Sequence, residues 1–190
     1  MKFKAAILTK LKKDLLIEEI SLVNKLQFGQ ILVEVSHSGI CGSQLGEIDG
    51  VKGPDKFLPH LLGHEGSGIV REIGPNVTNF KIDDHVVLHW RPSVGIESNN
   101  PQYKLGNKKI NAGLVTTFNQ YAVISENRLT KIPKEYPLDL APLYGCAITT
   151  GFGVIENNAQ IKMGQSLVIF GSGGVGLNII QAAKLRGAFP

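Results

Sequence analysis

Short apolar runs, several of them alternating with polar residues, dominate the chain up to about residue 125. Alternation with a period of two is typical of β-strands. Clusters of Gly, Pro, Asn and Asp separate the runs at Gly50–Asp55, Gly74–Asn76 and Ile82–Asp84, and such clusters mark turns. Short strands with these breaks favour a compact, barrel-like β domain. The predicted strands are Lys4–Thr9, Leu15–Ile20, Ile31–Ser36, Ser67–Ile73, His85–Trp90 and Gln120–Ser125.

Other segments follow different patterns. Between Arg91 and Phe118 the chain is polar and without clear periodicity, which predicts a long loop. From Leu138 to Ile155 the apolar spacing is helical, and Asp139 lies where a helix N-cap is expected. The short apolar run Ser166–Phe170 predicts a buried strand, and Gly174–Arg186 predicts a helix with one apolar face.

Composition and charge exclude several classes of protein. The hydrophobic content of 43% and the charged content of 19% are ordinary for a soluble globular protein. The net charge is +4, and no block of Lys and Arg is interleaved with aromatic residues, so a nucleic-acid partner is not indicated. No apolar stretch approaches the roughly 18 residues of a membrane-spanning helix. Two cysteines form no disulfide framework in a chain of this size, so we expect a cytoplasmic location.

A glycine-rich loop joins the predicted strand Ser166–Phe170 to the helix that follows it. Strand, glycine loop and helix open the βαβ unit that binds dinucleotides. Gly171 allows the tight turn, Gly173 lets the backbone approach a pyrophosphate, and Gly176 allows close contact between helix and strand. Free N–H groups at the start of the helix favour the anion. The predicted cofactor-binding residues of the loop are Gly171, Gly173, Gly174, Val175 and Gly176.

The chain stops at Pro190, where the second strand of this unit would begin. An acidic residue that binds the ribose is expected about 20 positions after the glycine loop. Those positions are absent, so the choice between NAD and NADP cannot be read. The sequence therefore indicates a truncated polypeptide, and we expect this piece alone to bind the cofactor weakly.

Two cysteines and one histidine are candidate metal ligands: Cys41, His64 and Cys146. Thiolates and imidazole suit zinc better than magnesium or calcium. Catalytic zinc takes three protein ligands and leaves the fourth position open. The residue types alone leave another interpretation open, because cysteine and histidine also occur as ordinary core residues.

The sequence around these residues resembles the zinc-containing alcohol dehydrogenases of the medium-chain dehydrogenase/reductase family. The motifs are Gly39–Ser43, Gly63–Gly66 and Gly145–Gly151, followed by the glycine loop in the same order. The resemblance implies an α+β architecture. Residues 1–153 would form a GroES-like, β-rich catalytic domain, and residues 154–190 would hold the first strand and helix of a truncated Rossmann α/β domain.

The resemblance also implies roles for individual residues around the metal. Cys41, His64 and Cys146 match the three ligands of the catalytic zinc. Glu65 matches the carboxylate beside the metal, and Ser43 matches the hydroxyl that takes the alcohol proton. Zinc acts as a Lewis acid in such a site, and hydride passes between the alcohol and the nicotinamide.

Two further positions match residues around the substrate and the cofactor. Thr150 matches a residue that touches the nicotinamide, and Trp90 falls where the family has an aromatic residue of the substrate pocket. Ordinary structural roles stay open at this point: Ser43 could cap a turn, and Trp90 could belong to the core.

The sequence departs from the family pattern in three places. Many relatives have an Asp that orients the zinc histidine where this chain has Gln44, whose oxygen can accept from His64 without a full charge. Relatives often end a proton relay with a histidine where this chain has Gly46. The segment matching the structural-zinc lobe, Arg91–Ala112, contains no cysteine. We therefore expect one catalytic zinc and no structural zinc.

Taken together, these features predict an enzyme. It would transfer hydride between a small-molecule alcohol, or an aldehyde or ketone, and NAD or NADP, and this chain would be its N-terminal part. One alternative is a zinc-free reductase of the same superfamily; the other is a truncated metal-binding protein without catalytic activity. The sequence does not identify the alcohol. A homo-oligomer is possible, and the sequence does not give the oligomeric state.

Overall fold

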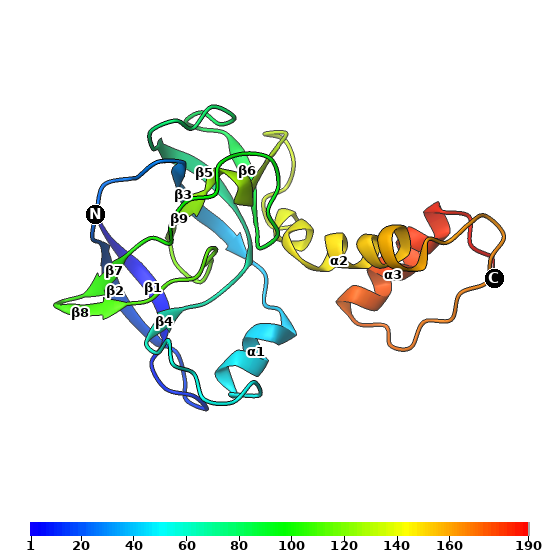
Figure 1. The fold of residues 1–190 in the computed structure, drawn as a ribbon, viewed down its shortest axis with the longest axis horizontal. Helices are drawn as coiled ribbons and strands as arrows, with labels where there is room; N and C mark the ends of the chain where they lie inside the picture. The colour runs from blue at the N-terminus through cyan, green and yellow to red at the C-terminus, as the bar shows by residue number, and fades with distance from the viewer. Residues whose placement is uncertain (190) are drawn as a thin grey trace.

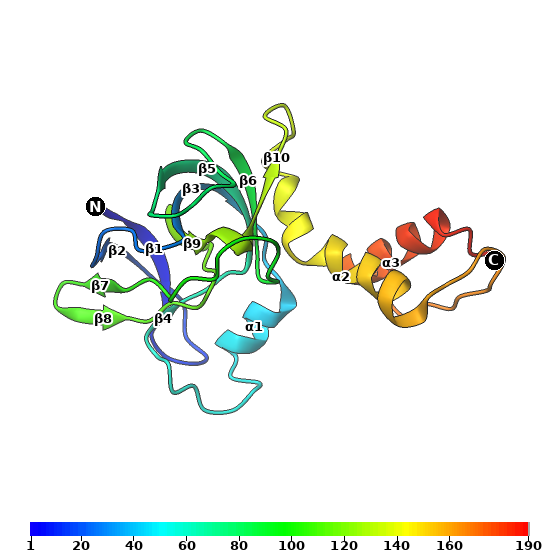
Figure 2. The same ribbon diagram turned by 45° about the horizontal axis from the view of Figure 1, so that its top comes forward.

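Two five-stranded antiparallel sheets form a β-rich body in the computed structural model, which describes residues 1–189 (Figures 1 and 2). The first sheet has the order β4-β1-β2-β7-β8, with β4 (His60–Leu61), β1 (Lys2–Leu8), β2 (Leu16–Leu22), β7 (Tyr103–Leu105) and β8 (Lys108–Ile110). The second has the order β10-β6-β5-β3-β9, with β10 (Leu129–Ile132), β6 (His85–His89), β5 (Glu65–Ile73), β3 (Gln30–Ser38) and β9 (Tyr121–Ser125).

The six strands predicted before residue 126 are all present, as β1, β2, β3, β5, β6 and β9. Their alternation reflects burial: Phe3, Ala5 and Ile7 lie in the core, whereas the intervening Lys2 and Lys4 are exposed. Four strands were not predicted, namely β4, β7, β8 and β10. Each is too short to show a period of two, and tertiary pairing decides its conformation.

Each sheet has its own apolar cluster, and Tyr103 connects the two sheets. Its ring packs edge-on against Phe3 with centroids 5.9 Å apart, inside the cluster of the first sheet. Its hydroxyl accepts a hydrogen bond of 3.0 Å from the backbone N–H of Val123 in β9, which belongs to the second sheet. Burial raises the pKa of this phenol, so the hydroxyl stays protonated.

The long loop expected over Arg91–Phe118 is present for most of its length, but a short hairpin interrupts it. This segment contains the β7–β8 hairpin, which turns at Gly106 with φ +58° and extends the first sheet. The sequence pattern did not reveal the hairpin because each strand has only three residues. Tyr103 is the only buried side chain of β7, and Ile110 is the only one of β8.

A short polar segment, Glu126–Arg128, directly follows β9. It ties the beginning of the Arg91–Phe118 segment to the second sheet. We call it the Glu126–Arg128 clamp; it is a 3₁₀ turn of three buried residues. The Glu126 carboxylate accepts the N–H groups of Thr78 and Asn79, both at 2.9 Å, and of Ile96 at 3.0 Å. Of these donors, Ile96 belongs to the lobe Arg91–Ala112, which is thereby held against the turn.

The clamp holds Glu97 as well. The carboxylate of Glu97 accepts from Arg128 Nη2 and from Asn127 Nδ2, both at 2.7 Å. Since Arg128 is buried, its guanidinium is paired in a poorly solvated position, where a charge-assisted hydrogen bond is strong. Packing and hydrogen bonds therefore order this lobe.

The predicted helix over Leu138–Ile155 is divided into three pieces. A 3₁₀ turn (Ala141–Gly145) is followed by α2 (Ala147–Gly153) and by a π-helical turn (Val154–Ala159). The first break falls at Cys146, whose φ of −145° is not helical. Asp139 is not the cap; Leu140 occupies that position and no side chain caps the turn.

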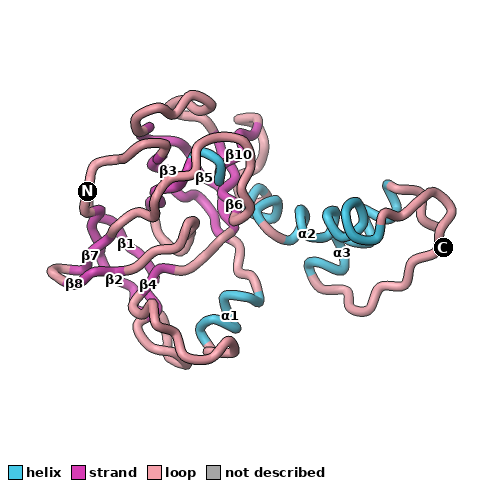
Figure 3. The backbone as a smooth tube through the Cα atoms, viewed as in Figure 1, coloured by secondary structure: helices cyan, strands magenta, loops and turns pink. Residues whose placement is uncertain are grey.

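The expected strand Ser166–Phe170 is not formed, and the segment is drawn as loop in Figure 3. Val168 is 76% exposed and Phe170 is 96% exposed. A strand needs a hydrogen-bonded neighbour, and residues 1–189 provide none beside this segment. The predicted helix that follows is present as α3 (Gly174–Leu185).

Helix α3 packs against α2 and the π-helical turn at some distance from the β body (Figures 1 and 2). Ile155, Ala182 and Ala183 form the small buried cluster between these elements. Within residues 1–189, no helix combines the length and the apolar character needed to cross a membrane.

We predict that Glu126→Gln lowers the free energy of unfolding by roughly 1–3 kcal/mol, because one carboxylate oxygen is replaced by an NH₂ group facing a buried N–H. Burial alone would raise the pKa of Glu126, but the N–H groups of Asn79, Thr78 and Ile96 outweigh it and hold the pKa below its usual range. The stabilisation is therefore complete at neutral pH and is lost as the pH falls through this lowered pKa.

Urea denaturation at pH 7 and at acid pH measures this effect. The difference between wild type and Glu126→Gln should shrink at acid pH. Glu135→Gln, at an exposed glutamate, is the matched control and should change little. Equal stability of all three proteins at pH 7 would show that the clamp does not stabilise the fold.

Candidate metal centre

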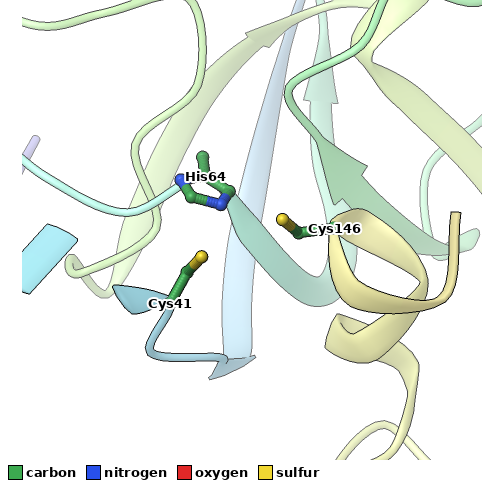
Figure 4. Close-up of side chains that lie close together, drawn as sticks. All are labelled: Cys41, His64 and Cys146. Atoms are coloured by element: carbon green, nitrogen blue, oxygen red, sulfur yellow. The ribbon is translucent and has the colours of Figure 1, made fainter. Parts of the chain in front are cut away.

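Cys41, His64 and Cys146 come together from distant parts of the chain (Figure 4). Cys41 is the N-cap of α1 (Gly42–Ile48), a short helix that was not predicted. His64 immediately precedes β5, and Cys146 lies between the 3₁₀ turn and α2. The two sulfur atoms and a ring nitrogen of His64 all lie within 4.8 Å of one another.

Backbone constraints hold these three residues in position. Gly63, just before His64, has φ +94°, and a Cβ there would lie 2.2 Å from Thr117 Oγ1, so only glycine fits. A Cβ on Gly145, just before Cys146, would lie 2.7 Å from the carbonyl oxygen of Leu88. The chain is thus packed tightly at both points, against the segment before β9 at Gly63 and against β6 of the second sheet at Gly145.

The donor set fits a zinc ion. His64 Nε2 is buried and has no hydrogen-bond partner among residues 1–189, and in Figure 4 a ring nitrogen of His64 points towards the two sulfurs. Burial lowers the pKa of His64, which favours the neutral imidazole that a metal requires. Two thiol sulfurs and one imidazole match the ligands of a catalytic zinc with an open fourth position.

The electrostatics of Cys146 also favour a bound cation. Burial, followed by the charges of Cys41 and Glu65, raises the pKa of the Cys146 thiol to about 11. A thiolate is therefore unfavourable here when no positive charge is nearby. A divalent cation between the two sulfurs would offset this cost, because metal binding and thiol deprotonation are coupled.

Gln44 contacts the other nitrogen of His64, but through its Nε2 and not through the oxygen that the sequence predicts. The amide is 4% exposed, and its Nε2 lies 2.5 Å from His64 Nδ1, while its Oε1 is buried without a partner among residues 1–189. When Nε2 of His64 holds a metal, Nδ1 carries the proton and needs an acceptor. Rotation of the Gln44 amide by 180° supplies that acceptor, and a neutral amide then replaces the carboxylate of many relatives.

Glu65 begins β5 directly behind the three ligands and is 5% exposed. Burial raises the pKa of its carboxyl, and a hydrogen bond from the Ala147 N–H opposes that rise. The carboxylate fits only because Gly39 has no side chain: a Cβ there would lie 2.8 Å from Glu65 Cδ. A cation at the three ligands would favour the ionised form of this carboxyl.

The remaining candidates lie around this centre in different settings. Ser43 is exposed in the first turn of α1, which begins without a side-chain cap. Thr150 lies on α2, and its N–H donates to the Cys146 carbonyl at 2.9 Å. Trp90 follows β6 and is 43% exposed, with the Arg91 guanidinium 5.0 Å from the ring centroid. The core interpretation of Trp90 is therefore wrong.

Two positions of the glycine loop have a backbone that requires glycine. Gly171 has φ +95°, and a Cβ on Gly176 would lie 2.1 Å from the Gly171 carbonyl oxygen. Gly173 is the N-cap of α3, and the space around it is open to 4 Å. The N–H groups at the start of α3 are thus accessible to an anion.

Comparison with known proteins decides the family. The profile of the alcohol dehydrogenase GroES-like domain matches residues 27–134. The chain belongs to this family. It is 33% identical to a class-3 alcohol dehydrogenase of Dictyostelium discoideum over 97% of this chain and 55% of that protein. It is 31% identical to the class-3 enzyme of Cereibacter sphaeroides over 99% of this chain and 56% of that protein.

Solved structures give the same assignment. The benzyl alcohol dehydrogenase of Acinetobacter calcoaceticus is similar with a TM-score of 0.85 and 31% identity, over 99% of this chain and 57% of that one. The resemblance to zinc-type alcohol dehydrogenases is thereby confirmed, and the β-rich body is the GroES-like domain. The chain spans little more than half the length of these relatives.

Sequence reasoning missed one cluster of candidate ligands, formed by Glu47, Asp55 and His60. Their spacing matches no metal-binding motif. His60 lies in strand β4 and is 7% exposed. Only the tertiary fold brings it beside the two carboxylates.

We predict that Gln44→Ala weakens zinc binding roughly 10- to 100-fold, because His64 loses the partner that fixes its ring and tautomer. Competition with a chromophoric zinc chelator measures the affinity. Gln102→Ala, at an exposed glutamine, is the control and should bind zinc like wild type. Unchanged affinity in Gln44→Ala would mean that the contact does not support the metal.

Proposed function

We propose that this protein is a zinc-dependent oxidoreductase that transfers hydride between a small-molecule alcohol, or an aldehyde or ketone, and NAD or NADP. The observation that carries the proposal is the convergence of Cys41, His64 and Cys146 within 4.8 Å. Family membership supports it, because the relatives are named as alcohol dehydrogenases. A zinc-free reductase would not require two thiols and an unpartnered imidazole nitrogen to face one another.

The proposed chemistry divides the tasks among the residues of the site. A zinc ion held by the three ligands would supply Lewis acidity towards the oxygen of the alcohol or carbonyl. Ser43 is exposed at the start of α1, two residues from Cys41, where its hydroxyl can pass a proton to solvent. Glu65 would hold negative charge behind the ligands, and Trp90 would present an aromatic wall to the substrate.

The cofactor would bind along the helical part of the chain. Gly171–Gly176 and the first N–H groups of α3 would receive the pyrophosphate, and Thr150 on α2 would contact the nicotinamide. The packing of α3 against α2 supports this division, because it joins the pyrophosphate loop to the helix that begins after Cys146. We assign residues 1–153 to the catalytic domain and residues 154–190 to the start of a Rossmann domain.

We further propose one zinc per chain. The clamp at Glu126–Arg128 supports this number, because it ties Ile96 and Glu97 to the sheet by hydrogen bonds. The lobe that holds a structural zinc in some relatives is therefore ordered by other means.

Metal analysis of purified protein tests the proposed centre. Wild type should contain about one zinc per chain, the number for a single catalytic site. Cys146→Ala should lose most of it, because two ligands hold zinc far less tightly than three. Met163→Ala, at a residue 86% exposed, is the control. Zinc-free wild type after expression with added zinc would favour the zinc-free reductase.

We predict that Ser43→Ala lowers kcat/KM for alcohol oxidation by about 10²- to 10⁴-fold, the range for loss of a positioned proton acceptor. Its zinc content should stay at the wild-type level, since Ser43 is not a ligand. Ser43→Thr keeps the hydroxyl and should recover most of the activity. Spectrophotometric assay of nicotinamide reduction measures all three proteins, and full activity of Ser43→Ala would remove Ser43 from the mechanism.

A further inference from the structure

Glu47, Asp55 and His60 form a second cluster of metal-ligating side chains. Glu47 lies in the last turn of α1, Asp55 in the following loop and His60 in β4. One potential ligand atom from each lies within 4.8 Å of the other two. None of the three belongs to the Cys41–His64–Cys146 centre, so the cluster needs an explanation of its own.

The ring of His60 points its Nε2 at the two carboxylates. Nδ1 of His60 lies 2.9 Å from the carbonyl oxygen of Leu61, which can only accept, so Nδ1 donates to it. Nε2 lies 2.8 Å from Asp55 Oδ2, the distance of a hydrogen bond, and 3.9 Å from Glu47 Oε1. One imidazole nitrogen and two carboxylates therefore converge around a side chain that is 92% buried.

The cluster has more negative charge than His60 can balance. Two carboxylates carry a charge of about −2, and a proton between Nε2 and Asp55 would offset only half of it. No Lys or Arg within residues 1–189 forms an ion pair with Glu47 or Asp55, although Lys52 and Lys56 lie along the same loop. A divalent cation would balance the charge.

The ligands are held in place by contacts that do not involve a cation. The Phe57 N–H donates to Asp55 Oδ1 at 2.8 Å, which leaves Oδ2 facing His60. Asn111 Nδ2 in turn donates to the Phe57 carbonyl at 2.7 Å, and β4 pairs with β1 at Leu8. Ligands fixed in this way lose little conformational entropy when a metal binds.

The surroundings leave room for further ligands. Glu47 and His60 line a cavity of about 370 Å³ that also reaches Asn111 and Asn100. Water molecules held there by these polar side chains can complete a coordination shell. The Glu47 side chain is 40% exposed, which gives a cation a route of entry from solvent.

We propose that Glu47, Asp55 and His60 form a second divalent-cation site, distinct from the thiol-containing centre. Imidazole favours transition metals over Ca²⁺ and Mg²⁺, and two carboxylates without a thiolate suit Mn²⁺. A cation at this position connects α1 to the following loop and to β4. Because α1 also begins at Cys41, the cation would stiffen the helix next to the first centre. The inference does not depend on the proposed function.

Titration with Mn²⁺ tests the site, with free Mn²⁺ followed by electron paramagnetic resonance. The protein is first loaded with zinc so that the thiol centre is filled. Wild type should bind about one Mn²⁺ per chain, and Mn²⁺ should raise its thermal midpoint. Glu47→Gln and Asp55→Asn should each bind Mn²⁺ at least about tenfold more weakly, since each removes one anionic ligand.

Asp49→Asn is the matched control, because it removes one negative charge from the exposed residue that caps α1 outside the cluster. It should bind Mn²⁺ like wild type. Cys146→Ala should also retain Mn²⁺ binding, which separates this site from the zinc centre. Wild type without bound Mn²⁺, or equal binding in Glu47→Gln, Asp55→Asn and wild type, would overturn the proposal and leave a His60–Asp55 ion pair.

Discussion

The antiparallel pairing of β3 with β5 is the constraint on which the metal centre depends. The two strands are in register at Ser38 and Gly66, where β3 ends and β5 begins. Cys41 follows Ser38 by three residues, and His64 precedes Gly66 by two, so strand pairing brings both candidate ligands to the same end of this strand pair. Cys146 reaches the same place because Gly145 has no side chain and packs directly on β5 and β6.

Polar groups, as well as the apolar cores, determine how the segments outside the sheets are held. The Glu126–Arg128 clamp and the Asp55–His60 contact each use a buried or half-buried charge to fix a loop. A buried charge that lacks its partner is costly, so such contacts specify one arrangement of the loop more sharply than apolar packing does. The hydrophobic pattern of the sequence predicts neither of these two loop conformations.

The sequence predicted the features that depend on local pattern or on motifs. Long strands such as β3 and β5 showed their alternation, and the three candidate metal ligands were found because their flanking glycines matched a known family. Helix α1 was missed, since Gly42 and Gly46 are poor helix formers within only seven residues. The strand at Ser166–Phe170 was expected from composition alone, but strand formation depends on a neighbour that residues 1–189 do not provide. The convergence of Glu47, Asp55 and His60 depends on tertiary structure and leaves no trace in spacing.

The hydroxyl of Tyr103 has a consequence for solubility and cooperativity. Strand β9 lies at the edge of the second sheet, where unpaired backbone groups invite another chain to add a strand. One of those groups, the Val123 N–H, donates a hydrogen bond to the Tyr103 hydroxyl, which belongs to the other sheet. The same contact therefore protects an open edge against intermolecular pairing and couples the two sheets, so that the β-rich body opens as one cooperative unit.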